Sequence, residues 1–345
     1  MKKNTSFLIS GGSGRIITAI PALEKYARLN PDDEFKVLVH GWDTIYWSHP
    51  ILQEKTFEVS QKGVFENYIK NYNLICPEPY HVYGYYNQEK SLAESFDEII
   101  NKTNDHSDLN KPNLYVSYEE RARIKTNIET LRQTTKKDKI IVIQPFGSGA
   151  TIENNVFIDS SGRSMYPEDL KELSHHLSQY ATLIYFGSPE LFEFVNSSDI
   201  FCPPMADLRM YMTLISECDY FIGCDSVGQH MARAFDKKGL VLMGSTFEKN
   251  VSYPDYFKFY RNENIRLKYN PIRIGGLDCQ LADRCNDGVM KFNEDQLKEI
   301  FNIIGEDLEY GKQKSISIIG EDLKYGKQKS IKTTNTGKLG EKKGF

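Results

Sequence analysis

Short apolar runs alternate along the chain with longer segments in which apolar residues recur at helical spacing. Apolar runs bounded by Gly, Pro or polar residues are typical of buried strands, and the periodic segments favour amphipathic helices. The pattern predicts strands at 6–10, 34–39, 140–144, 182–186, 220–223 and 240–243, and helices at 16–27, 93–101, 117–133, 167–179, 209–218 and 229–235. Strands that alternate with helices in this way indicate an α/β fold with parallel sheets.

The alternation is interrupted by a polar stretch, residues 136–139, in which three lysines and one aspartate precede a new apolar run. A chain of 345 residues is long for a single core and fits two domains of about 150 residues each. We therefore predict two doubly wound, Rossmann-like domains, 1–137 and 138–305, that face a cleft, followed by a tail, 306–345.

The tail region contains a tandem duplication, since residues 303–317 read IIGEDLEYGKQKSIS and residues 318–332 read IIGEDLKYGKQKSIK. Two copies are too few to build a solenoid. The residues after Leu323 include seven lysines and one glutamate and carry +6, so the rest of the chain carries −10 within the total of −4. Such a lysine-rich segment is expected to be disordered. A solvated tail is the favoured interpretation, and contact with nucleic acid or an anionic membrane stays open.

Composition places the chain among globular proteins, with 40% hydrophobic and 26% charged residues. No apolar run reaches the ~20 residues that a transmembrane helix needs, and the first residues lead into a strand rather than a signal peptide. The six cysteines form no CxxC motif, which favours free thiols, with a Cys279–Cys285 pair left open. Free thiols and the absence of a signal peptide lead us to expect a cytoplasmic protein. We expect no metal ion, because the cysteine pair lacks further ligands at useful spacing.

The strand 220–223, the turn after it, the helix 229–235 and the strand 240–243 form a predicted βαβ unit. The open N-terminus of such a helix attracts anions through its free backbone N–H groups and its dipole. Asp225 and Ser226 suit the capping positions, and His230 could donate a hydrogen bond to a phosphate oxygen. Purely structural roles for these residues fit the sequence equally well.

The same unit carries a family resemblance. The segment 225–230, DSVGQH, and the segment 244–246, GST, resemble the donor-phosphate signature of glycosyltransferase family 9, the heptosyltransferase-like enzymes of lipopolysaccharide assembly. Gly228 stands one place later than the family's glycine, and Ser245 replaces its proline. The resemblance covers residues 5–300 and implies the GT-B fold, with the donor site in the second domain. It also implies inverting, metal-independent transfer from a nucleotide-sugar co-substrate, without another cofactor.

The beginning of the chain carries a second match, because residues 14–23, GRIITAIPAL, resemble the family's opening. In the family an Asp acts as the general base at the position that Arg15 occupies here. A guanidinium group cannot accept a proton at neutral pH, so Arg15 is expected to hold a phosphate or carboxylate, or to be solvated. His40 and Asp43, at the C-terminal end of the strand 34–39, are the candidate replacement bases. Structural roles for both stay open.

Further donor-binding residues follow from the resemblance. Gly147 and Ser148 lie in a small-residue loop where the family has a His-Pro-Gly loop, and Arg163 stands one place from the family's lysine. Glu190 matches an acidic residue that can reach the ribose hydroxyls, although it also fits as a helix N-terminal charge.

The stretch 68–86 is rich in aromatic residues and also contains Pro and Gly. Tyr80, Tyr83 and Tyr85 could stack on the face of a sugar or a nucleobase, or could form an irregular packed layer. As a group they mark the expected acceptor side.

The sequence therefore predicts a glycosyltransferase that moves a sugar from a nucleotide-sugar to a glycan or lipid-linked saccharide. One alternative is a glycosyltransferase that acts on modified DNA bases, with the lysine-rich tail on the phosphates. The net negative charge of the chain before the tail argues against this alternative, because a cleft that binds DNA should be basic. The other alternative is a catalytically silent sugar-nucleotide-binding protein, which Arg15 favours.

Overall fold

The computed structural model describes residues 4–159, 161–203, 207–244, 246–262 and 288–309. Residues 1–304 form one compact unit, and residues 305–345 form a second one. The predictions for Ser245, for the pair Cys279 and Cys285, and for the duplicated tail beyond residue 309 lie outside the described residues.

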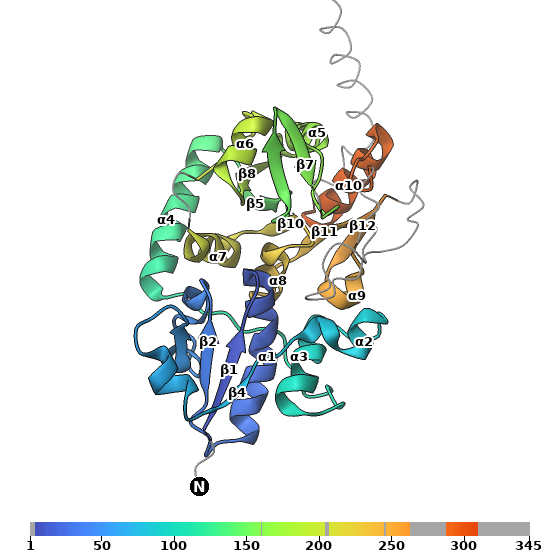
Figure 1. Ribbon diagram of the computed structural model, residues 1–345. Coiled ribbons are helices and arrows are strands. Elements are labelled where there is room, and N and C mark those ends of the chain that lie inside the picture. The colour runs from blue at the N-terminus through green and yellow to red at the C-terminus, as the bar shows by residue number, and fades with distance from the viewer. Residues whose placement is uncertain (1–3, 160, 204–206, 245, 263–287, 310–345) are drawn as a thin grey trace, which may run out of the picture. The chain divides into compact units, whose positions relative to one another are not determined.

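The N-terminal half of the compact unit contains a four-stranded parallel sheet in the order β3-β2-β1-β4 (Figure 1). Its strands are β1 (Thr5–Ile9), β2 (Lys36–Val39), β3 (Thr56–Glu58) and β4 (Asn73–Ile75). Its helices are α1 (Ser13–Leu29), α2 (Tyr83–Tyr86) and α3 (Leu92–Asn101), with short helical segments η1 (Asp43–Tyr46), η2 (Gln53–Lys55), η3 (Phe65–Ile69) and η4 (Pro79–His81). α1 and α3 pack against each other.

The C-terminal half contains a six-stranded parallel sheet in the order β12-β11-β10-β5-β8-β9, and an antiparallel hairpin, β6-β7. The strands are β5 (Lys139–Gln144), β6 (Ala150–Glu153), β7 (Val156–Asp159), β8 (Ala181–Tyr185), β9 (Ile200–Phe201), β10 (Tyr220–Cys224), β11 (Gly239–Met243) and β12 (Lys258–Arg261). The helices are α4 (Tyr118–Thr135), α5 (Pro167–Leu177), α6 (Pro189–Val195), α7 (Leu208–Glu217), α8 (Val227–Ala234), α9 (Glu248–Val251) and α10 (Glu294–Asp307).

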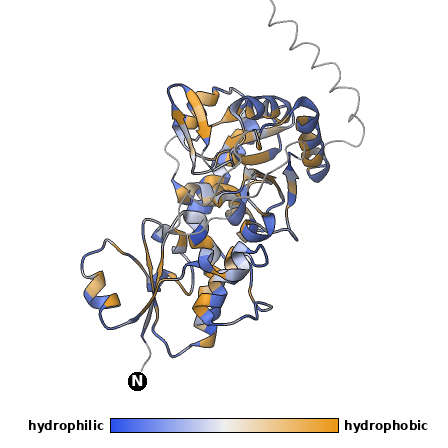
Figure 2. Cartoon of the chain, turned by 45° about the vertical axis from the view of Figure 1, so that its right-hand side comes forward, coloured by the Kyte–Doolittle hydropathy of each residue, from blue (hydrophilic) through white to orange (hydrophobic). Residues whose placement is uncertain are grey.

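The burial of the inner strands of the larger sheet explains why the apolar runs predicted these strands. Every residue of β8, β10 and β11 is buried, as expected for parallel strands covered on both faces. In Figure 2 the strands are coloured mainly as hydrophobic, whereas the helices carry both colours. The predicted strands are confirmed to within two residues at either end. The shorter strands β3, β4, β6, β7, β9 and β12 were not predicted.

The helix starts are also informative. Ser117 and Glu120 form the predicted capping box, in which the Ser117 side chain accepts from the Glu120 N–H and the Glu120 side chain accepts from the Ser117 N–H. The first helix was predicted from residue 16, but α1 begins at Ser13 and runs through Pro21. The loop before α1 therefore ends at Gly12, which places the N-terminus of α1 directly after β1.

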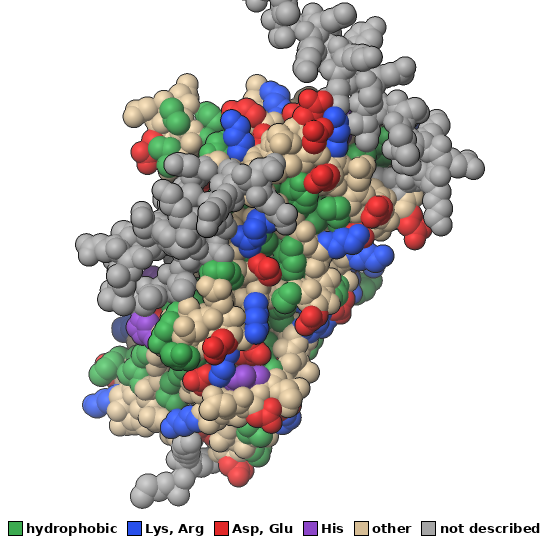
Figure 3. All heavy atoms as spheres, turned by 90° about the vertical axis from the view of Figure 1, so that its right-hand side faces the viewer, with side chains coloured by type: hydrophobic (Ala, Val, Ile, Leu, Met, Phe, Trp, Pro, Cys, Tyr) green, Lys and Arg blue, Asp and Glu red, His purple; other side chains and the backbone are tan. Residues whose placement is uncertain are grey.

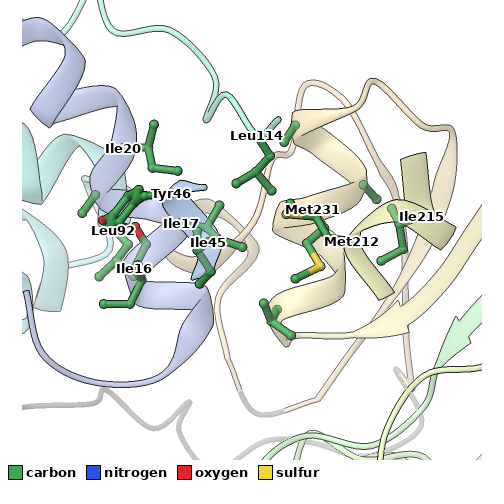
Figure 4. Packing of buried hydrophobic residues seen from close by; sticks show 14 of the residues in the cluster. Ile16, Ile17, Ile20, Ile45, Tyr46, Leu92, Leu114, Met212, Ile215 and Met231 are labelled. Atoms are coloured by element: carbon green, nitrogen blue, oxygen red, sulfur yellow. Dashed lines mark hydrogen bonds between the residues drawn. The ribbon is translucent and has the colours of Figure 1, made fainter. Parts of the chain in front are cut away.

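One continuous hydrophobic cluster joins the two halves. It includes Ile17 of α1, Met231 of α8, and Leu114 from the segment between α3 and α4, which lies between the two groups of side chains in Figure 4. Arg209 of α7 adds a polar connection. Its guanidinium donates to the carbonyl oxygens of Thr44 at 3.3 Å and Trp47 at 3.2 Å in the N-terminal half, and its Nε donates to Glu120 Oε1 of α4 at 2.8 Å.

Candidate functional site

A cavity of about 590 Å³ is lined by residues from both halves of the compact unit. The N-terminal half contributes the start of α1, residues 12–15, and side chains from the loops after β2 and β4. The C-terminal half contributes the loops that follow β5, β8, β10 and β11, which are the carboxyl ends of its parallel strands. Ligands of open α/β sheets bind at this end of the strands. The cavity is therefore the candidate site.

The N-terminus of α8 opens on this cavity through Asp225, Ser226 and Val227. Ser226 occupies the N-cap position, as expected, but its side chain makes no capping hydrogen bond. The cap comes instead from Gln144 at the end of β5. Its Oε1 accepts from the Gly228 N–H at 2.7 Å, and its Nε2 donates to Ser226 Oγ at 3.2 Å.

The same contact requires glycine at position 228. A Cβ at this position would lie 2.5 Å from Gln144 Oε1 and 2.7 Å from ring carbons of Phe221. The helix can approach the sheet this closely only with glycine at this position. Gly228 does not itself line the cavity, and its effect on the site is to seat α8 on the strands.

The carboxylate of Asp225 faces two side chains. Oδ1 accepts a hydrogen bond of 2.8 Å from Gln229 Nε2, and Oδ2 lies 3.8 Å from the nearest nitrogen of Arg163. Arg163 also donates to the Asp225 carbonyl oxygen at 3.0 Å. Asp225 therefore acts on the cavity mainly by fixing the guanidinium of Arg163.

Seven of the predicted donor-binding residues line this cavity: Arg15, Gly147, Ser148, Arg163, Asp225, Ser226 and His230. A nitrogen of Arg163 lies 3.3 Å from Ser148 Oγ, and the Gly147 N–H donates to Ser164 Oγ at 2.9 Å. Burial alone would lower the pKa of Arg163, but nearby acidic groups, above all Asp225, outweigh it and raise the pKa above its usual value. The guanidinium is therefore a fixed positive charge in the cavity wall.

The loop that carries Arg163 is held by Asp159, a residue that the sequence did not single out. The Asp159 carboxylate accepts from the N–H and hydroxyl of Ser161 and from the N–H groups of Arg163 and Ser164. Burial raises the pKa of Asp159, but these hydrogen bonds outweigh it and leave the pKa below its usual value. A charged Asp159 therefore fixes the backbone at Ser161, Arg163 and Ser164.

His230 lines the cavity and is almost completely buried. Its Nδ1 lies 2.9 Å from the hydroxyl of Tyr253, and desolvation lowers the pKa of the imidazole to about 3. The opposite edge of the ring faces α1, where a Cβ on Gly14 would lie 3.1 Å from its Cδ2. His230 is therefore a neutral hydrogen-bonding group, positioned where α8 meets α1.

Arg15 is already engaged. Its Nη2 donates to the Pro77 carbonyl oxygen at 2.9 Å and to the Glu78 carboxylate at 3.1 Å, and its guanidinium lies 5.1 Å from the ring centroid of Tyr80. Its side chain is 9% exposed. Arg15 lines the cavity as a positive charge neutralised by Glu78, a partner that no local pattern could predict because it lies far away along the chain.

The remaining predicted residues differ in placement. Tyr80 and Tyr85 line the cavity, whereas Tyr83 is 66% exposed and contacts Tyr86. His40 and Asp43 follow β2 but do not line the cavity, although their neighbour Trp42 does. Glu190 is exposed in the first turn of α6, outside the lining.

Among the described residues, no group of three or more His, Cys, Asp or Glu side chains could hold a metal ion. No helix in the described part of the chain is long and apolar enough to cross a membrane.

No protein-family model matches the sequence, and no curated protein matches it. Solved structures do match. A glycosyl transferase family 9 protein from Veillonella parvula DSM 2008 aligns over 90% of this chain and 98% of its own, with a TM-score of 0.65 and 13% identity. The ADP-heptose lps heptosyltransferase II of E. coli aligns over 76% of this chain and 91% of its own, with a TM-score of 0.55 and 14% identity.

A third match is TibC, an iron-containing dodecameric glycosyltransferase from enterotoxigenic E. coli H10407. It aligns over 89% of this chain and 78% of its own, with a TM-score of 0.54 and 12% identity. The chain therefore has the predicted GT-B fold, in the form seen in the heptosyltransferases of glycosyltransferase family 9. At this identity the likeness concerns the fold.

Proposed function

We propose that this protein is a glycosyltransferase that moves a sugar from a nucleotide-sugar donor to a saccharide acceptor. One observation carries the proposal. In a GT-B fold, the fixed guanidinium of Arg163, the loop with Ser148 and the N-terminus of α8 converge on one cavity. This is the chemistry that holds a diphosphate, because charge-assisted hydrogen bonds and helix N-termini both favour anions.

The proposed reaction is a single inverting displacement at the anomeric carbon. As the bond to the diphosphate breaks, negative charge grows on the leaving oxygen, and Arg163 and the dipole of α8 offset it. We take the Tyr253 hydroxyl to donate to Nδ1 of His230, so that Nε2 keeps its proton and can donate to the leaving group. Because the protein itself supplies positive charge beside the diphosphate, the proposed reaction needs no metal ion. Activity is therefore expected to survive excess EDTA.

Asp43 is the proposed general base. It begins η1 directly after Trp42, which lines the cavity, and it is half-buried. His40 is the weaker candidate, because its side chain is 79% exposed and its Nδ1 lies 3.6 Å from the Glu58 carboxylate. Asp43→Asn is expected to lower kcat by about 10²-fold or more with little change in the KM of the donor. An unchanged kcat would remove Asp43 from the reaction.

One observation favours the catalytically silent alternative. Arg15 lies in the cavity wall at the position of the family's base, and as a cation paired with Glu78 it cannot accept a proton. Slow release of the free sugar from the donor, in the absence of any acceptor, would separate an enzyme from a silent binding protein. The DNA-directed alternative has no such support. On the face shown in Figure 3, acidic and basic side chains are interspersed.

The test of the proposal is a thermal-shift screen against nucleoside diphosphates and nucleotide-sugars. A ligand at 100 times its Kd stabilises the folded state by about 2.7 kcal/mol. Arg163→Ala should abolish the shift, whereas Arg123→Ala, which removes an exposed arginine of α4, should not. If no nucleotide stabilises the wild-type protein, the glycosyltransferase proposal fails.

A further inference from the structure

The charges of the cavity wall are already paired. The cationic side chains among the described lining residues are Arg15 and Arg163. Arg15 contacts the Glu78 carboxylate at 3.1 Å, and Arg163 lies 3.8 Å from the Asp225 carboxylate. Arg163 belongs to the diphosphate side in the proposed function, so the charged side chains on the α1 side of the cavity, Arg15 and its partner Glu78, leave no net charge for an incoming group.

The rest of the α1 side consists of residues 12–14 at the start of α1 and of a mainly apolar group of larger side chains, Trp42, Tyr80, Tyr85 and Leu92. Tyr85 is 5% exposed. Tyr80 is covered by the guanidinium of Arg15 over its ring and by the ring of Tyr85, whose centroid lies 5.3 Å from its own. Trp42 is only half-buried. It packs against the hydrophobic cluster, and it also lines the cavity.

We propose that the acceptor is an uncharged sugar that stacks its apolar face on Trp42. This inference rests on the proposed function and narrows its acceptor. An indole presents a large apolar surface with a polar edge, which suits the C–H face and hydroxyl rim of a sugar ring. A carboxylate or phosphate on the acceptor would lose water without gaining an unpaired cationic side chain on this wall, and that loss is costly.

The chain offers a sharp test because it contains two tryptophans, Trp42 and Trp47. Trp47 is 51% exposed and does not line the cavity. Trp47→Phe leaves Trp42 as the single reporter, and Trp42→Phe leaves Trp47. The two single-tryptophan proteins are matched controls for each other in a fluorescence titration.

The probes are neutral sugars and acidic counterparts: glucose with glucuronate, galactose with galacturonate, and the neutral disaccharides maltose, lactose and chitobiose. A saturable change in emission for at least one neutral sugar is expected in the Trp47→Phe protein and not in the Trp42→Phe protein. The acidic counterpart of a responding monosaccharide should bind more weakly. The proposal is overturned by a response to the acids alone, by equal responses of both single-tryptophan proteins, or by no response at all.

A kinetic readout separates stacking from a merely structural role. With the acceptor that the fluorescence titration identifies, Trp42→Ala should raise the KM of the acceptor by about tenfold, which is the loss of one modest stacking contact. The KM of the donor should change less than twofold, and Trp42→Phe should restore part of the affinity. Equal losses for donor and acceptor would indicate a damaged fold rather than a lost stacking surface.

The two proposals can fail separately. If nucleotides stabilise the protein but no neutral sugar changes the emission of Trp42, the acceptor inference fails and the glycosyltransferase proposal stands. If neutral sugars change the emission and no nucleotide stabilises the protein, the site binds sugar but the proposed transfer reaction is lost.

Discussion

The backbone N–H of Gly228 donates a hydrogen bond of 2.7 Å to the side-chain oxygen of Gln144. The donor lies in the first turn of α8 and the acceptor ends β5, so a side chain from a neighbouring strand performs the capping that local residues usually perform. The side-chain Nε2 of Gln144 in turn donates to Ser226 Oγ at 3.2 Å. Gln144 thus holds the first turn of α8 in the place where the diphosphate is proposed to bind.

Gln144→Ala should therefore destabilise the protein. It leaves the buried Gly228 N–H without its acceptor, which costs about 1–3 kcal/mol. Chemical denaturation measures the loss, and Gln133→Ala, at an exposed position of α4, is the matched control. A loss no larger than that of the control would mean that water caps α8 as well as Gln144 does.

Gly244→Ala is expected to be more damaging. A Cβ at Gly244 would lie 1.9 Å from the backbone oxygen of Gly162, so one of the two backbone segments would have to move. Overpacking of this kind costs about 1–3 kcal/mol, and occasionally more. Gly12→Ala is the control, because nothing lies within 4 Å of a Cβ there. Equal melting temperatures for the two variants would contradict the prediction.

Glu120 should make stability depend on pH. Hydrogen bonds from Arg209 outweigh burial and hold the pKa of this carboxyl below the ordinary value of 4.5. A lowered folded-state pKa means that the contribution is complete above pH 4.5 and is lost as the pH falls through the lower value. The stability difference between wild type and Glu120→Gln should shrink in that window. Glu119→Gln, in the same first turn but exposed, should show no such trend.

His230 should make the stability of the protein depend on pH over a wider pH range than Glu120 does. Its folded-state pKa of about 3 lies below the unfolded value of 6.5, because burial disfavours the charged ring. The unfolded chain therefore binds a proton that the folded chain does not, and stability falls as the pH drops from 6.5 toward 3. His230→Gln should flatten this slope in denaturation measured at several pH values, and the exposed His81→Gln should leave it unchanged. A wild-type profile that is flat across this range would show that the buried ring is protonated without cost.

The central strands of this fold could be predicted from the sequence because they are buried on both faces. The apolar runs at 220–223 and 240–243 match β10 and β11 to within one residue. Strands of two to four residues, such as β9 and β4, are too short to leave a pattern, and α1 tolerates a Pro21 that suggested a later start.

The site was harder to predict, and the reason is separation along the chain. The residues of the motif at 225–230 could be singled out because they follow one another in sequence. Gln144 and Glu78 were missed because their partners, Gly228 and Arg15, lie 84 and 63 positions away. Trp42 was passed over because a single aromatic residue after a strand carries no pattern, and only the cavity distinguishes it from Trp47.

The hydrophobic cluster that runs without interruption from α1 through Leu114 to α8 has an evolutionary consequence. Two halves that share one interior cannot be exchanged like cassettes between relatives, because a transplanted partner would have to reproduce side chains such as Met212 and Met231. New donor or acceptor preferences are therefore expected to arise in the loops at the strand ends, while the shared interior changes slowly. Chimeric proteins cut near residue 137 should aggregate unless Ile17, Leu114 and Met231 come from the same parent.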